Sequence, residues 1–153
     1  MKKITLLAIT ALLVLSFSKA NAHCEIPCGI YEDSLRIALI NEHITTIEKS
    51  MKKIDELSKS EVVNYNQLVR WTNNKEHHAE ELQEIVSQYF LHQRIKISNK
   101  ANDAVFEKYT KQLVLLHKLL VYSMKCKQTT DLEFIAKLRA TSNDFEEMYF
   151  HKH

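Results

Sequence analysis

Residues 33–60 read DSLRIALINEHITTIEKSMKKIDELSKS, and this stretch sets the pattern for most of the chain. Its apolar side chains recur every three or four residues, at Ile37, Ile40, Ile44, Ile47, Met51 and Ile54. That spacing places them on one face of an amphipathic α-helix. Asp33 or Ser34 is suited to cap the start of the helix, and the serines at 58 and 60 interrupt the pattern. The stretch predicts a long helix with one buried face.

A second periodic stretch begins near residue 60. Its predicted inner face carries Tyr65, Leu68, Thr72, Lys75, Ala79, Leu82, Val86 and Tyr89. Polar residues at 72–75 weaken that face and allow a kink there. Residues 98–102 then predict a connection, with Asn102 as the N-cap of the next helix.

The remaining sequence predicts two further helices. The third carries Val105, Tyr109, Leu113, Leu116 and Leu120, and it ends within residues 126–130. Thr130 and Glu133 form a capping-box pattern, and the fourth helix follows with Phe134, Leu138, Phe145 and Met148. Four amphipathic helices with short connections predict an all-α fold of one domain, an up-down-up-down four-helix bundle.

The first 22 residues have the pattern of a secretion signal. Two lysines precede an apolar run from Ile4 to Phe17, which is short for a membrane span. Ala20-Asn21-Ala22 has the small-x-small pattern that signal peptidase cuts. We therefore expect a cleaved signal peptide at 1–22 and a mature domain at 23–153. Cleavage would free the α-amine of His23, a group that can bind a metal because its pKa is only about 8.

The composition of the mature chain narrows the function classes. It would have 131 residues, and loss of Lys2, Lys3 and Lys19 lowers the basic count from 21 to 18 against 19 acidic residues. A net charge of about −1 predicts no nucleic-acid partner. No second apolar run is long enough to span a bilayer, so we expect no stable membrane association after cleavage. The signal indicates export, to the periplasm rather than the medium.

The new N-terminus is chemically distinct from the rest of the chain. Residues 23–31 read HCEIPCGIY, and they hold the only proline, the only glycine and two of the three cysteines. Pro27 and Gly29 flank Cys28 and favour a turn that brings both thiols to one point. We call residues 23–31 the hook.

The residues alone leave four interpretations of Cys24 and Cys28. The first is a disulfide in an oxidising compartment. The second is tetrahedral zinc, although no further Cys/His pair has finger spacing. The third is a redox dithiol, although the spacing is not C-x-x-C. The fourth is a metal bound by amine, amide and two thiolates in a plane, a donor set that suits Ni²⁺. Composition favours the disulfide and the metal about equally.

The motif His-Cys-x-x-Pro-Cys-Gly-x-Tyr at a processed N-terminus resembles that of the nickel superoxide dismutases. This resemblance implies a four-helix-bundle subunit, one nickel ion per subunit and a homohexamer. It implies that His23 supplies its amine and imidazole, Cys24 its amide nitrogen and thiolate, and Cys28 its thiolate. It also implies that superoxide is converted to O₂ and H₂O₂ by cycling between Ni(II) and Ni(III).

The resemblance extends to one further hook residue and weakens beyond the hook. Tyr31 stands where the family has a tyrosine above the open face of the metal, so we include it among the catalytic residues. Glu25 stands where some members have Asp, and His78 aligns with an Arg that pairs with the axial imidazole through a Glu. These roles are not carried over to Glu25 and His78.

Two rival functions use the same hook. An exported metal carrier would use the same ligands with an exchangeable metal, and a structural helical bundle would use the two cysteines as a disulfide. Outside the hook, Cys126 is predicted to be a buried small side chain. The spacings of His77-His78 and of His151 with His153 do not predict a defined metal site.

Overall fold

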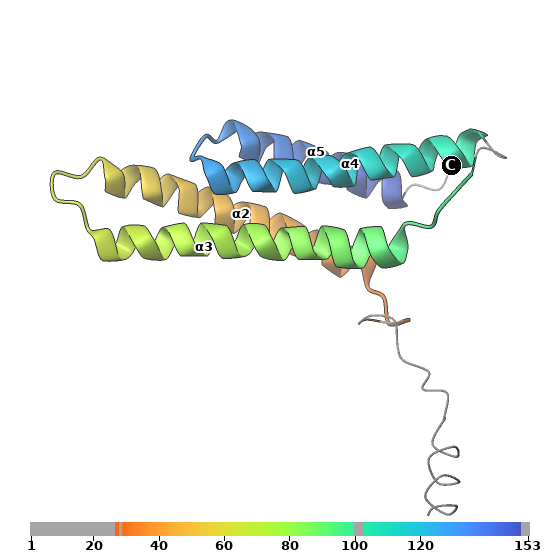
Figure 1. The fold of residues 1–153 in the computed structure, drawn as a ribbon, viewed down its shortest axis with the longest axis horizontal. Coiled ribbons are helices and arrows are strands. Elements are labelled where there is room, and N and C mark those ends of the chain that lie inside the picture. Colours follow the sequence, from red (N-terminus) through yellow and green to blue (C-terminus); the bar gives the residue numbers. More distant parts are fainter. Residues whose placement is uncertain (1–26, 28, 100–102, 151–153) are drawn as a thin grey trace, which may run out of the picture. The chain divides into compact units, whose positions relative to one another are not determined.

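The computed structural model describes residues 27, 29–99 and 103–150. The chain divides into two units, residues 1–31 and residues 32–153. The second unit contains the helices shown in Figure 1: α2 (Asp33–Ser58), α3 (Tyr65–Glu84) with its π-helical continuation η1 (Ile85–Arg94), α4 (Asp103–Gln128) and α5 (Glu133–Phe150).

Successive helices of this unit run in opposite directions. Helix α2 packs against α3 and α5, and α4 packs against α3 and α5 (Figure 1). The predicted all-α, up-down-up-down four-helix bundle is therefore confirmed for the described residues of this unit, 32–99 and 103–150. Short connections between neighbouring helices favour this topology, because each helix then packs against the one before it.

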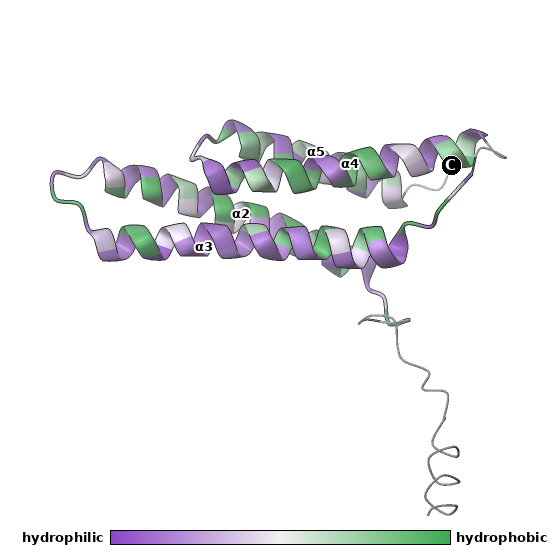
Figure 2. Ribbon diagram, in the orientation of Figure 1, coloured by the Kyte–Doolittle hydropathy of each residue, from purple (hydrophilic) through white to green (hydrophobic). Residues whose placement is uncertain are grey.

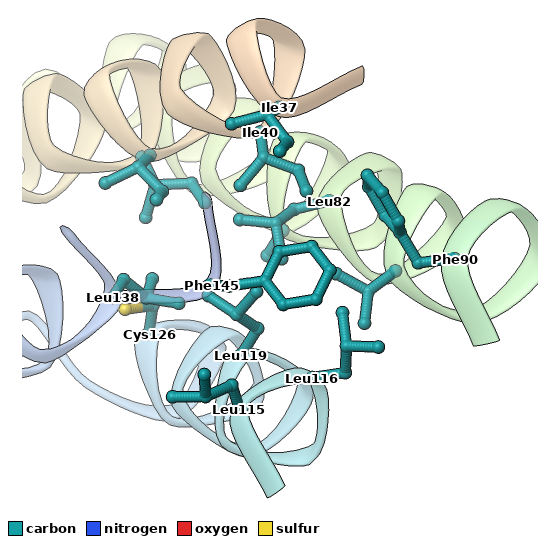
Figure 3. Packing of buried hydrophobic residues seen from close by; sticks show 14 of the residues in the cluster. Ile37, Ile40, Leu82, Phe90, Leu115, Leu116, Leu119, Cys126, Leu138 and Phe145 are labelled. Atoms are coloured by element: carbon teal, nitrogen blue, oxygen red, sulfur yellow. The ribbon is translucent and has the colours of Figure 1, made fainter. Parts of the chain in front are cut away.

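The core lies along the inner faces of all four helices. Each helix alternates hydrophobic and hydrophilic residues along its length (Figure 2). Phe90 and Phe145 are fully buried, and their rings meet edge to face with centroids 5.0 Å apart (Figure 3). Cys126 is buried in the same cluster, as predicted. No helix in the described part of the chain is long and apolar enough to cross a membrane.

The predicted helix faces are correct in the middle of the bundle and wrong at two ends. All the apolar positions predicted for α2 are buried except Ile54, which is half-buried. Tyr65 is 71% exposed and Val105 is 52% exposed, although both were predicted to face inward. Each lies in the first turn of its helix. The apolar spacing continues to that end of the helix, but fewer neighbouring helices are present there to cover the side chain.

The possible kink at residues 72–75 is not observed. Helix α3 is continuous from Tyr65 to Glu84, and Lys75 itself is buried. The α-helical geometry changes later, at Ile85, where η1 begins. Its last turn closes with a bond from the Ile95 backbone N–H to the Phe90 carbonyl, five residues earlier. Such π-helical turns insert a residue and rotate the side chains that follow.

Two predicted caps differ from the observed ones. The N-cap of α2 is Glu32, whose side chain makes no capping bond, and Asp33 lies inside the first turn. Before α5, the carboxylate of Asp131 accepts from the Glu133 backbone N–H at 2.9 Å, in place of the Thr130 cap of the predicted box. Asn102, the predicted cap of α4, lies outside the described residues. The ends of α2 at Ser58 and α4 at Gln128 agree with the prediction.

Candidate metal centre

The described part of the hook consists of Pro27 and residues 29–31. Pro27 and Gly29 each lie in a bend, and Gly29 has a φ of +81°. An L-residue side chain is disfavoured at that φ even though a Cβ there would meet no neighbouring atom. The conformation of Gly29 is compatible with the turn predicted around Cys28, while that turn itself stays a prediction.

The predicted metal ligands are not among the residues described. His23, Cys24 and Cys28 lie outside that part of the chain, as does Glu25, so their assignment stays a prediction. Tyr31 is described and is 37% exposed. Its predicted place above a metal face also stays a prediction. The described residues contain no group of three or more His, Cys, Asp or Glu side chains arranged to bind a metal ion.

Asp33, two residues after Tyr31, is the centre of a polar cluster at the start of α2. Its Oδ1 accepts from Nε of Arg94 at 2.7 Å and from the hydroxyl of Tyr89 at 2.6 Å. Its Oδ2 accepts from Nη2 of Arg94 at 2.6 Å and from the hydroxyl of Tyr149 at 2.9 Å. The cluster therefore joins α2 to η1 and α5, and both carboxylate oxygens have two donors.

The cluster shifts the pKa of each acidic member. Burial acts to raise the pKa of Asp33, but hydrogen bonds from Arg94, Tyr89 and Tyr149 outweigh it and lower that pKa. Burial and the hydrogen bond to the Asp33 carboxylate raise the pKa of Tyr89 to about 12 and that of Tyr149 to about 12. At neutral pH the two tyrosines are therefore protonated donors and Asp33 is an ionised acceptor.

His78 meets a histidine on another helix. Nδ1 of His78, on α3, lies 2.9 Å from Nδ1 of His43, on α2. The two rings are tilted by 47° with centroids 5.2 Å apart, and both side chains are half-buried. One ring donates and the other accepts, which requires the accepting ring to be neutral with its proton on Nε2.

The pair predicts that stability falls in mild acid. Burial, followed by its histidine neighbours, lowers the pKa of His43, and burial, followed by His77, lowers that of His78. The unfolded chain therefore binds protons more readily than the folded chain does. The contribution of the two histidines to the free energy of unfolding is complete above about pH 6.5, and it is lost as the pH drops through their pKa values in the folded state.

Urea unfolding at pH 7.5 and 5.5 checks this prediction. We expect a lower free energy of unfolding at pH 5.5, and a smaller fall in a His43→Gln variant. The exposed His117 on α4 supplies the control, because His117→Gln should keep the fall seen in the natural chain. Equal stability of the natural chain at the two pH values would contradict the prediction.

Lys75 is a buried cation that holds the end of α4. Its Nζ donates to the carbonyl oxygen of Cys126 at 2.9 Å and to that of Lys127, and lies 3.2 Å from a carboxylate oxygen of Glu76. Carbonyl groups at a helix C-terminus lack partners within the helix, so a cation there is favourable. Burial raises the pKa of the Cys126 thiol beside it to about 11, which keeps that thiol protonated and unreactive.

Replacing Lys75 with methionine is expected to lower the free energy of unfolding by about 2–3 kcal/mol. Methionine fills a similar volume but leaves two carbonyl groups without their charged donor. Urea denaturation measures the change. Lys53→Met is the matched control, because Lys53 forms an exposed pair with Glu56 and should cost less than about 0.5 kcal/mol. Similar costs for the two variants would contradict the role given to Lys75.

Comparison with known protein families gives one match to the chain. Residues 18–153 match the family described as nickel-containing superoxide dismutase. The chain belongs to the nickel-containing superoxide dismutase family. The comparisons with curated proteins and with solved structures gave no significant match. As a nickel superoxide dismutase, the protein is an oxidoreductase whose substrate is superoxide and whose cofactor is nickel.

The donor groups of the hook fit the nickel of this family. Two thiolates, an amide nitrogen, an amine and an imidazole would be strong donors, and such a mixed nitrogen and sulfur set suits nickel. All of them occur within six residues of the predicted cleavage site. The left-handed turn at Gly29 follows the second cysteine directly, so the chain can reverse there without strain.

Two side-chain clusters of this nickel superoxide dismutase were not predicted from sequence. Asp33 was considered only as a helix cap, and His43 was not singled out. The spacing of His43 does carry a signal, because it precedes Ile44 and so lies at the border of the buried stripe. No local signal connects it to His78, which is 35 residues away.

Proposed function

We propose that the N-terminal hook is the catalytic centre and that His23, Cys24 and Cys28 bind the nickel. His23 would supply its free amine and its imidazole, Cys24 its amide nitrogen and thiolate, and Cys28 its thiolate. The support is the family match over residues 18–153 together with a donor set that suits nickel. The family match is the observation that carries the proposal.

When bound, the nickel supplies a one-electron couple between its +2 and +3 states, through which one superoxide is oxidised to O₂ and a second is reduced to H₂O₂ with uptake of two protons. The residues of the hook would make this couple accessible. The thiolates of Cys24 and Cys28 would donate charge to a bound nickel and stabilise its higher state, and the imidazole of His23 would add a further donor. The protein thereby sets the potential of the ion and the access of substrate.

Tyr31 is proposed to orient the substrate. Its phenolic hydroxyl can donate or accept a hydrogen bond, so it is suited to bind a small oxygen anion or an ordered water. Its position three residues after Cys28, beyond the turn at Gly29, keeps it close along the chain to the proposed ligands.

Export and assembly form part of the same proposal. The segment at 1–22 would be cleaved as a signal peptide, which creates the free amine that His23 needs. The mature domain at 23–153 would act outside the cytoplasm, in the periplasm, without stable membrane association. As the resemblance to the nickel superoxide dismutases implies, it would assemble as a homohexamer with one nickel ion per subunit.

The proposal is tested on mature protein with His23 as its untagged first residue. Metal content by mass spectrometry should give about one nickel per chain, and the EPR spectrum as isolated should be rhombic with splitting from one axial nitrogen. Dismutation of superoxide should accompany that signal. A bridged Cys24 and Cys28 without nickel, even after anaerobic nickel loading, would overturn it and favour a disulfide-stapled bundle. Nickel that exchanges freely without dismutase activity would favour a metal carrier.

A further inference from the structure

We propose that His43 and His78 form a second metal site, separate in sequence from the hook, which binds a divalent transition metal ion of the Ni(II) or Cu(II) class through both Nδ1 atoms. Imidazole nitrogen is the commonest protein ligand for these ions. The site would link α2 to α3 within the bundle. It does not depend on the function proposed for the hook.

The distance between the two nitrogens fits this class of ion. A metal–nitrogen bond is about 2.0–2.1 Å long, so two nitrogens at 90° around the metal are about 2.9 Å apart, whereas tetrahedral geometry separates them by about 3.3 Å. The observed Nδ1–Nδ1 distance is 2.9 Å. This separation is close to the one that two nitrogens take at 90° around an ion, the angle that Ni(II) and Cu(II) favour.

The hydrogen bond between the two rings already leaves one Nδ1 atom without a proton. A metal would replace the hydrogen bond between them, with the donor ring shifting its proton to Nε2, so no net proton need leave the protein. Ligand atoms that already face each other cost little to organise.

The surrounding charges favour a cation. The carboxylates of Glu42 and Glu81 act to raise the pKa of both histidines, which is the sign expected of a negative field at the rings. His77, the remaining titratable neighbour, acts in the opposite direction on both. Glu42 and Glu81 are exposed, so they leave room for water in the other coordination positions.

The pair stands on two helices that pack against each other. His43 precedes Ile44 and His78 precedes Ala79, and both of these neighbours are fully buried in the core. Ligands on two packed helices are held more closely than ligands on loops. A metal at this site would therefore act as a clamp between α2 and α3, and it would stabilise the folded state because it binds that state selectively.

The test is nickel titration of the mature holoprotein that already contains one nickel per chain. Calorimetry in a non-coordinating buffer at pH 7.5 should show a second equivalent of Ni²⁺, with a rise in the melting temperature. His43→Gln and His78→Gln should each weaken this second binding by at least about tenfold, since even partners outside the ligand shell change metal affinity by about 10–100-fold. His77→Gln and His117→Gln, both at exposed positions, should retain it.

Two outcomes would overturn the proposal. One is the absence of a second equivalent, and the other is a second equivalent that persists in His43→Gln and His78→Gln, which would place it on other surface histidines. Protection of His43 and His78 from diethyl pyrocarbonate by added nickel, mapped by mass spectrometry, needs no variant and should be observed. Loss of the first equivalent or of its EPR signal would count against the hook and not against this site.

Discussion

A Cys28→Ser variant is expected to lose dismutase activity by more than about a hundredfold. A serine hydroxyl does not ionise at neutral pH, whereas a cysteine thiol with a pKa of about 8.5 becomes a thiolate when it binds a metal. If Cys28 binds the nickel as proposed, the variant would lose charge that the trivalent state of nickel needs. Changes to partners outside the ligand shell already cost about 10–100-fold, so the loss of a ligand costs more. Stopped-flow decay of superoxide, with nickel content measured in parallel, checks the result.

Cys126→Ala is the matched control for this experiment. Cys126 is fully buried and its thiol has a pKa raised to about 11, so it is not expected to bind metal. The variant should retain its nickel and its activity, at the cost of a small cavity in the core. Full activity of Cys28→Ser, or equal loss in the two variants, would contradict the assignment of the hook.

Asp33→Ala is expected to lower the free energy of unfolding by about 3 kcal/mol. Removing one partner of a buried ion pair costs about 3–5 kcal/mol, and the lower end applies because the Arg94 side chain is 26% exposed. The variant also leaves the hydroxyls of Tyr89 and Tyr149 without their acceptor. Urea denaturation at pH 7.5 measures the loss.

Asp55→Ala provides the control, because Asp55 forms an exposed pair with Lys59 and should cost less than about 0.5 kcal/mol. The lowered pKa of Asp33 adds a second check. The contribution of ionised Asp33 to the free energy of unfolding is present above the usual pKa of 3.8. It is lost as the pH falls through the lower pKa that Asp33 has in the folded protein. If Asp33→Ala unfolds as the natural chain does, the cluster does not hold the start of α2.

The fold followed from the period of the apolar residues. The stripe from Ile37 to Met51 predicted the buried face of α2, because residues three and four apart share one side of a helix wherever it packs. The same reasoning failed at Tyr65 and Val105, since a period shows which residues share a face and not whether another helix covers it. It also missed the π-helical turn at Ile85, which leaves no mark in the apolar spacing.

The candidate hook was likewise found from local sequence. Its ligands are close together along the chain and follow a cleavage pattern, so their proximity needs no tertiary contact. The family match agrees with that interpretation, while the positions of His23, Cys24 and Cys28 stay a prediction. Asp33 shows the limit of this local reasoning. Aspartate is a residue type that often caps helices, yet the carboxylate of Asp33 binds side chains 56, 61 and 116 residues away.

The sequence by itself therefore determined the four helices and most of their inner faces, and it brought the candidate donor groups of the hook close together along the chain, because each of these features depends on residues within a few turns of one another. Only the tertiary structure decided which polar side chains meet across helices. Lys75 reaches the end of α4, Arg94 reaches Asp33, and His78 reaches His43. These contacts depend on the rotation and register of one helix against another, and these are set by the packing of the whole core.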